Sequence, residues 1–161
     1  METPDPETIA AHLIAFRDQF FGARIDNAAL MTFLNFCGPR STGIYIFHHE
    51  NRCLYVGRSR HLYWRPLQSL HRIDKKLRTA KAATEGITYD PTALEIWIAP
   101  TSDEIAQEAN HIHHLEPWAN KNTERHSRTG RPDALTFTKF RPFCEAAWQP
   151  SRIARSRRTV T

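Results

Sequence analysis

Hydrophobic residues recur at helical spacing through the first forty positions of the chain. Asp5-Pro6 is typical of a helix start, because an aspartate caps free N–H groups and proline suits the first turn. A second stripe starts near Asn27 and stops at Gly38. The pattern predicts two helices, the first ending near Gly22, that form an N-terminal helical extension over residues 1–40.

The following segment changes to the period of a β-strand. Residues 43–47 and 53–57 alternate and are rich in β-branched and aromatic side chains, and a polar stretch of five residues separates them. This pattern predicts a hairpin. If the loop closes about Glu50, Tyr45 lies opposite Tyr55. The other face then carries Ile44, Ile46, Leu54 and Val56. From the hairpin alone, an ordinary cross-strand aromatic pair is the simpler interpretation of the two tyrosines.

Beyond the hairpin, the pattern predicts a helix and then a third strand. Ser59 can cap a helix that continues toward Lys76. Pro66 must either restart this helix near Arg65 or kink it, because proline lacks an N–H and clashes with the preceding turn. Residues 93–98 alternate as a strand.

A further helix follows that strand. Thr101 and Glu104 have the spacing of a capping box, and Pro117 ends the helix. Glu108 falls beside the apolar stripe, so its carboxylate is expected to be neither fully solvated nor deep in the core, which suits a metal ligand or an ion pair. The predicted core stripe is Ile105, Ala109, Ile112 and Leu115.

The same helix carries His111, His113 and His114. His111 and His114 are predicted to face the solvent. No cysteine and no HExxH spacing accompanies them, so a solvated helix face is favoured over a metal site for the three histidines.

Together these elements predict an α/β protein of the α+β type, with a small three-stranded, mainly antiparallel sheet flanked by helices. With 161 residues and 40% apolar content, the chain can bury one core, and a second full domain is not expected. We therefore predict one domain over residues 41–122 and a basic C-terminal extension over 123–161. In this extension residues 135–140 could form a short strand, and the last dozen residues are expected to be mobile.

The charge favours a polyanionic partner. The 22 Lys and Arg exceed the 17 Asp and Glu, which gives +5, and ten of these basic residues lie in 121–161. Residues 72–78 form a second basic run on a predicted helix face. Such a face is most often merely solvated, but beside a phosphate site it would be a contact surface.

Cysteine usage and hydropathy favour a cytoplasmic protein. Cys37, Cys53 and Cys144 are far apart and odd in number, so neither a disulfide framework nor a thiolate zinc site is predicted. No apolar run reaches the roughly 18 residues of a membrane span, and no membrane partner is expected. No heptad pattern is present, so the expected state is a monomer or a weak dimer.

Several of these residues, taken in order, resemble the GIY-YIG nuclease family. Gly43-Ile44-Tyr45 reproduces the first motif, and Tyr55-Val56-Gly57 matches the second with valine for isoleucine. The similarity continues through Arg58 and Arg65 to Glu108 followed by Pro117-Trp118-Ala119-Asn120. It covers about half of the chain and does not extend to either terminal extension.

The resemblance implies a GIY-YIG-like fold and a metal-dependent endonuclease that hydrolyses DNA phosphodiester bonds at a single active site. Glu108 would be the sole protein ligand of one Mg²⁺ or Mn²⁺ ion, which takes its other ligands from water and phosphate. Arg65 would hold the scissile phosphate. Tyr45 would activate the attacking water, alone or through another group, and Tyr55 would orient water or phosphate.

The resemblance also implies supporting roles. Arg58 would neutralise phosphate, Gly57 would let the backbone approach closely, and Asn120 would buttress the metal site. Several family members carry a histidine or tyrosine one helical turn after the arginine; this chain has Ser69 there, and the nearest candidate is His71. The basic residues expected to contact nucleic acid are Arg58, Arg60, Arg72, Lys75, Lys76, Arg155, Arg157 and Arg158.

Two other interpretations stay open. A nucleic-acid-binding module that keeps the fold but does not cut would use the basic charge and aromatics such as Trp64 and Trp118 equally well. Against it, pure binding has no use for a carboxylate such as Glu108 near phosphates. A structural or protein-interaction domain with a chance motif leaves the ordered set of motif residues unexplained.

Overall fold

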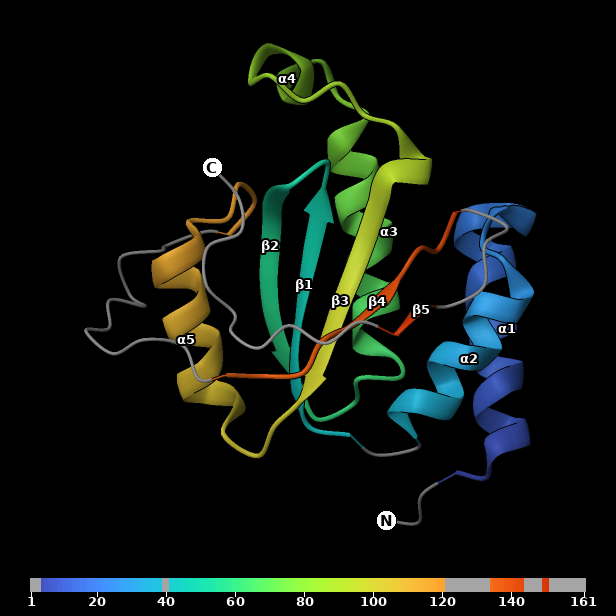
Figure 1. The fold of residues 1–161 in the computed structure, drawn as a ribbon. Helices are drawn as coiled ribbons and strands as arrows, with labels where there is room; N and C mark the ends of the chain where they lie inside the picture. Colours follow the sequence, from blue (N-terminus) through green and yellow to red (C-terminus); the bar gives the residue numbers. More distant parts are fainter. Residues whose placement is uncertain (1–3, 39–40, 121–133, 144–148, 151–161) are drawn as a thin grey trace.

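The structure is a computed structural model that describes residues 4–38, 41–120, 134–143 and 149–150. Helices flank an antiparallel sheet (Figure 1). The helices are α1 (Pro6–Phe21), α2 (Asn27–Cys37), α3 (Arg65–Leu77), α4 (Ala80–Thr84) and α5 (Glu104–Leu115), with 3-10 turns at Gly22–Arg24 and Pro91–Ala93. The strands are β1 (Gly43–His49), β2 (Arg52–Ser59), β3 (Leu94–Pro100), β4 (Thr138–Phe140) and β5 (Gln149–Pro150). The α+β class is confirmed, whereas the count of three strands is too low, since the described sheet has five in the order β2-β1-β3-β4-β5.

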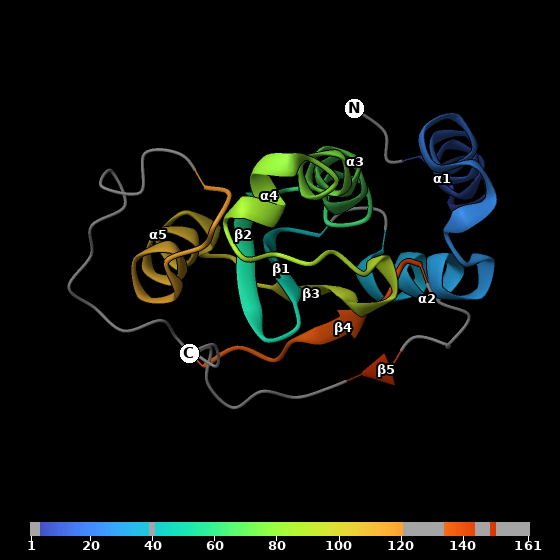
Figure 2. The same cartoon turned by 90° about the horizontal axis from the view of Figure 1, so that it is seen from above.

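The two N-terminal helices begin and end where the pattern predicts. The Asp5 side chain accepts a hydrogen bond from the Thr8 N–H at 3.0 Å, and α2 stops at Gly38, whose φ is 68°. Both helices share one hydrophobic core with the sheet. Figure 2 shows α2 beside β4, and Phe33 of α2 packs on Phe140 of β4 with ring centroids 5.1 Å apart. In the described ranges, no helix is both long and apolar enough to cross a bilayer.

The β1–β2 hairpin turns more tightly than predicted. Only Glu50 and Asn51 connect the strands, with φ of 48° and 66°, the left-handed pair typical of a two-residue type I′ turn. His48 and His49, which the polar pattern placed in a five-residue loop, are buried strand residues. The predicted five-residue loop is therefore wrong, because the polar residues at the ends of both strands were assigned to the loop.

This turn also changes the register of the hairpin. Tyr45 lies opposite Gly57, and Tyr55 lies opposite Phe47, with a β-bulge directly after Phe47. The predicted Tyr45–Tyr55 pair is wrong, although the two rings share a face with centroids 6.1 Å apart. The bulge turns Leu54 into the core on the tyrosine side, so its predicted place on the opposite face is also wrong.

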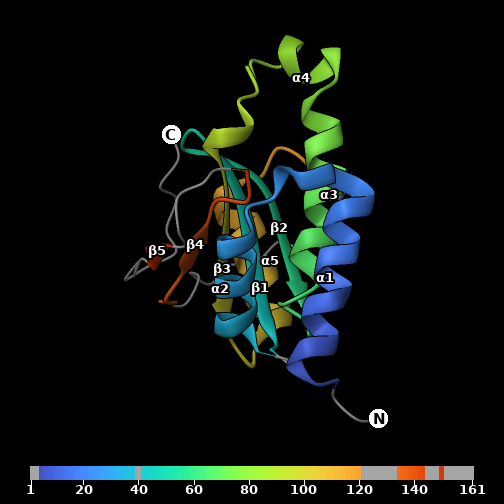
Figure 3. The same ribbon diagram turned by 90° about the vertical axis from the view of Figure 1, so that its right-hand side faces the viewer.

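The sheet separates two hydrophobic layers. Tyr45 and Phe47 belong to the layer that α1, α2 and α3 cover, and Figure 3 shows α1 and α3 together on that side. Ile44 and Ile46 belong to the other layer, with Ile112 of α5 and Phe137 before β4. The two motif tyrosines therefore face α3.

In the second layer, a buried histidine carries an acid-sensitive part of the stability. His48 is 3% exposed and stacks on Trp97, with ring centroids 4.0 Å apart. Burial, together with the nearby Lys139 ammonium, lowers the pKa of His48 from 6.5 to about 3. The unfolded chain takes up a proton near pH 6.5 while the folded protein does not. The stabilisation is therefore complete above that pH and is lost as the pH falls toward 3.

We expect the free energy of unfolding to fall by several kcal/mol between pH 6.5 and 3, at up to about 1.4 kcal/mol per pH unit from this group. His48→Phe keeps an aromatic ring on Trp97 and should flatten the slope. Denaturant unfolding across a pH series measures it. His113→Gln, which removes an exposed histidine, is the matched control. A slope equally steep in His48→Phe and the parent would contradict the assignment.

The helix α5 begins later than predicted, and its buried face includes Ala109, Ile112 and Leu115 of the predicted stripe but not Ile105. Asp103 is its N-cap residue, and the Thr101 hydroxyl accepts a bond from the Asp103 N–H at 3.2 Å, so a capping box that starts at Thr101 is wrong. Ile105 is 56% exposed, and His111 is buried against Phe137, which reverses the prediction for both residues. Phe137 covers this side of the helix from a distant segment, which local periodicity cannot reveal.

Candidate functional site

A groove of about 600 Å³ lies between α3, β2 and α5, and we call it the α3–α5 groove. Its walls come from β2, α3, α5 and the segment after α5. The lining residues are Tyr55, Arg72, Ile73, Lys75, Lys76, Thr79, Glu108, Ile112, Ala119 and Asn120. Basic side chains of α3 dominate its charge, and among the described lining residues Glu108 is the single carboxylate. Residues that the sequence analysis selected in separate segments thus meet in one groove.

The segment after α5 is fixed along the edge strand β2. The Asn120 side chain accepts a hydrogen bond from the Val56 N–H at 2.8 Å and donates one to the Val56 carbonyl at 2.9 Å. The N–H groups of Trp118 and Ala119 donate to carbonyls nearer the start of β2. These bonds occupy an edge that would otherwise be open. Asn120 therefore ties the end of α5 to β2, and its support of a metal site stays a prediction.

Glu108 lies on the groove wall, half-buried as predicted. Its side chain is 17% exposed, and its Oε1 accepts a hydrogen bond from the Arg58 Nε at 3.1 Å. Arg58 is 46% exposed and can therefore move away into solvent. A partly exposed carboxylate supplies the hard oxygen that Mg²⁺ and Mn²⁺ prefer. In the described part of the chain, no group of three or more His, Cys, Asp or Glu could hold a metal ion.

Tyr45 is buried and does not line the groove. Its ring is 1% exposed, and its hydroxyl lies 2.8 Å from the Ser69 Oγ. Burial, and to a smaller degree Tyr55, raises the pKa of Tyr45 to about 12, while Ser69 and the Arg65 guanidinium act in the opposite direction. Tyr45 is therefore protonated at neutral pH.

Ser69 is the contact that the sequence analysis missed. It lies one turn after Arg65, at the position where the resemblance leads one to look for a histidine or tyrosine. The signal was present in this spacing, but only the fold shows that the Ser69 hydroxyl meets Tyr45.

The helix α3 starts at Arg65, which settles the effect of Pro66. Proline occupies the first turn, where its missing N–H costs nothing, so the helix restarts there and is not kinked. Ser59 does not cap α3; its hydroxyl accepts from the His61 N–H at 2.8 Å in the preceding turn. Arg65 itself is exposed, and its charge acts on the Tyr45 hydroxyl.

Tyr55 is the motif tyrosine that reaches the groove. It is half-buried, and the Arg72 guanidinium lies 5.2 Å from its ring centroid. Lys76 lies 5.6 Å from the ring centroid of Trp118, which follows α5. Arg72 and Lys76 are thus held over aromatic rings at the groove.

The remaining predicted residues divide between the groove and other places. Lys75 lines the groove, and Arg60 is exposed in the loop after β2. His71 lies outside the groove, because its ring packs against Phe20 and Phe21 of α1 at 4.5 and 5.7 Å. The structure therefore does not bring His71 together with the predicted site residues that line the groove. Arg155, Arg157 and Arg158 lie outside the described residues.

Gly57 makes room for a side chain, namely the Tyr45 ring. A Cβ atom at Gly57 would lie 2.4 Å from the Tyr45 Cζ and 2.6 Å from its hydroxyl oxygen. We expect Gly57→Ala to lower the free energy of unfolding by about 1–3 kcal/mol, because an overpacked core forces neighbours to shift. Denaturant unfolding measures this loss. In a Tyr45→Ala background the same change should have little effect, and equal losses in both backgrounds would contradict the steric cause.

In comparisons with known proteins, no family model, no curated protein and no solved structure matches the chain.

Proposed function

We propose that this protein is a divalent-metal-dependent endonuclease that hydrolyses DNA phosphodiester bonds at a single GIY-YIG-type site in the α3–α5 groove. One observation carries the proposal. Tyr55, Glu108 and Asn120 line a single groove with the basic residues of α3, although they come from distant parts of the chain. A groove with cations for phosphate and one carboxylate for a metal ion suits phosphodiester hydrolysis.

Glu108 would hold the metal ion, because its carboxylate is the kind of ligand that a divalent ion takes. Its carboxylate is partly exposed and faces a positively charged groove, where a DNA phosphate would supply further oxygen ligands. When bound, the ion would polarise the phosphate and lower the pKa of a bound water.

The exposure of each remaining residue indicates the role that it would have. Arg72, Lys75 and Lys76 would bind phosphates along the groove, and Arg65 would offset charge on the scissile phosphate. Tyr55, which lines the groove, would orient water or phosphate directly. Tyr45 is buried and protonated, so it would position its neighbours through Ser69 and would not itself remove a proton from water.

Cleavage of single- and double-stranded DNA with Mg²⁺ tests the proposal. Metal-dependent cutting by the purified chain is the expected result. The alternative, a binding module that does not cut, has its own support, since the Arg58–Glu108 ion pair already occupies the carboxylate. Tight DNA binding with no cutting of any substrate, with Mg²⁺ or Mn²⁺, would favour that alternative and contradict the nuclease.

The same ion pair predicts competition between Arg58 and the metal ion. Arg58→Gln should raise the Mn²⁺ affinity of the DNA-free protein about two- to fivefold, because a partly exposed pair is worth up to about 1 kcal/mol. Paramagnetic resonance of free Mn²⁺ measures the affinity. Arg60→Gln, which removes the same charge from an exposed loop, is the matched control. An equal change in both variants would show a general charge effect and contradict competition at Glu108.

A further inference from the structure

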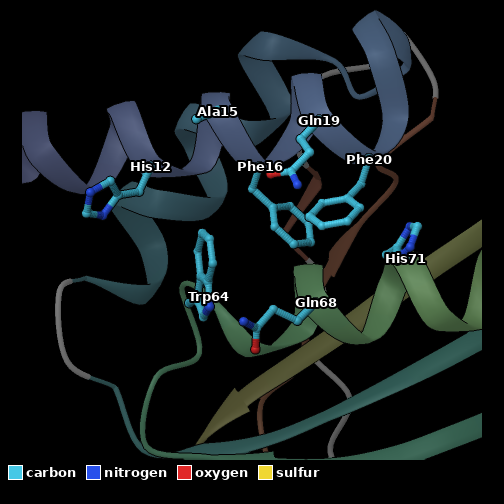
Figure 4. A pocket seen from close by; sticks show the side chains of 8 residues that line it. All are labelled: His12, Ala15, Phe16, Gln19, Phe20, Trp64, Gln68 and His71. Atoms are coloured by element: carbon cyan, nitrogen blue, oxygen red, sulfur yellow. The ribbon is translucent and has the colours of Figure 1, made fainter.

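A second pocket, which we call the α1–α3 pocket, has a volume of about 570 Å³ and lies on another side of α3. In Figure 4, α1 supplies Phe16, Gln19 and Phe20, and these face Trp64, Gln68 and His71 from the start and body of α3. Its volume lies within the range of about 300–1,000 Å³ that is usual for small-ligand sites.

The pocket has the chemistry of a site for a flat, uncharged, polar-edged group. Phe16 and Trp64 meet edge to face at 5.0 Å, and Phe20 lies 4.7 Å from Phe16 and 4.5 Å from His71 between ring centroids. Phe20 is 38% exposed, so its ring is available to a ligand. Among the described residues that line the pocket there is no carboxylate, lysine or arginine. A nucleobase has these properties, with faces that stack on aromatic rings and edges that bond to amides and imidazoles.

The position of the pocket connects it to the groove. Successive residues of a helix point about 100° apart, so two neighbouring rows run along α3. Trp64, Gln68 and His71 line the pocket. His71 is followed directly by Arg72, which lines the groove, whereas Ser69, which follows Gln68, contacts the buried Tyr45. A phosphate bound by Arg72 in the groove would therefore place an attached base next to the pocket.

We propose that the α1–α3 pocket binds an unpaired nucleobase of the DNA strand whose phosphates occupy the α3–α5 groove. The inference rests on the proposed function and makes it more specific. A base stacked inside a duplex cannot enter, so the substrate is a single strand or a duplex with an unpaired or flipped base. Stacking on Phe20 and Trp64 supplies affinity with little sequence preference, and the amides of Gln19 and Gln68 contact the base edges.

The test measures binding without cleavage. The full chain with Glu108→Gln, in the absence of divalent metal, is titrated into a short single strand that contains one 2-aminopurine, and into the same strand fully paired. We expect quenching of the 2-aminopurine in the single strand. Adding Phe20→Ala should weaken single-strand binding about tenfold and leave duplex binding unchanged. Gln68→Ala should weaken it less. Phe36→Ala, which removes an exposed aromatic ring from α2, is the matched control and should change neither.

Several results would overturn the proposal. One such result is that Phe20→Ala binds the single strand as tightly as its parent. Another is that it loses affinity equally for the single strand and the duplex. If Phe20→Ala loses only its binding of the amphiphilic dye anilinonaphthalene sulfonate and keeps its DNA affinity, the pocket is a site for an apolar ligand. Failure of the nuclease proposal gives a different result, because wild type would then cut no DNA while base binding in the pocket persisted. If wild type cuts DNA and Phe20→Ala binds the single strand as tightly as its parent, the proposal for the pocket alone is refuted.

Discussion

Glu108→Gln is expected to abolish DNA cleavage and to leave DNA binding in place. Glutamine keeps the size of the side chain and one oxygen, but it lacks the charge that holds a divalent ion. Loss of the stabilisation that a metal ion supplies, several kcal/mol, corresponds to a fall in rate of roughly a thousandfold or more. Without metal, the variant should bind DNA slightly more tightly, since a negative charge leaves a positively charged groove.

Single-turnover cleavage with Mg²⁺ and fluorescence anisotropy in chelator separate these two effects. Glu116→Gln is the matched control, because Glu116 is an exposed carboxylate at the C-terminal cap of the same helix. We expect its cleavage rate to equal that of wild type. Undiminished cleavage by Glu108→Gln would refute the metal assignment, and Mn²⁺ binding by this variant with wild-type affinity would do so independently.

Arg65→Ala is expected to lower the single-turnover cleavage rate about a hundredfold to a thousandfold, the usual effect of removing one group that stabilises developing charge. Arg65 is the first residue of α3, it is exposed, and its charge acts on the hydroxyl of the buried Tyr45. Its guanidinium therefore lies near Tyr45, at the start of the helix that covers this face of the sheet. Arg65→Lys should recover only part of the rate, because lysine restores the charge and not the planar pair of donors.

The contrast with a second arginine decides whether Arg65 acts on the reacting phosphate or only on affinity. Arg60→Ala removes an equal charge from the nearby exposed loop and should weaken DNA binding without changing the rate at saturating protein. If Arg65→Ala behaves like Arg60→Ala, with affinity lowered and the saturated rate kept, Arg65 is a binding residue and its proposed role is wrong.

Local sequence signals predict an element well where neighbouring residues alone decide its geometry. Asp5-Pro6 and Gly38 mark helix ends because capping and left-handed glycine conformations act within one turn. Pro66 illustrates the limit of such signals. The residue restricts the helix, but only the structure shows that it lies in the first turn and that α3 restarts at Arg65.

Signals failed at the hairpin turn and where the outcome depends on contacts with remote segments. The hairpin register follows from the left-handed Glu50 and Asn51 and from the bulge after Phe47, so Tyr45 came to lie opposite Gly57. His111 is buried because Phe137 covers it from a segment whose position no periodicity within α5 reports.

The sequence by itself determined the α+β class, the ends of the two N-terminal helices and the chemical groups available in the motif segments. Only the tertiary structure decided which groups meet. It brings Glu108 to Arg58, buries Tyr45 against Ser69, leaves Tyr55 to line the groove, and packs His71 on α1. The reason is physical: periodicity defines the apolar face of each helix, but the packing of distant segments determines which side chains beside that face come into contact.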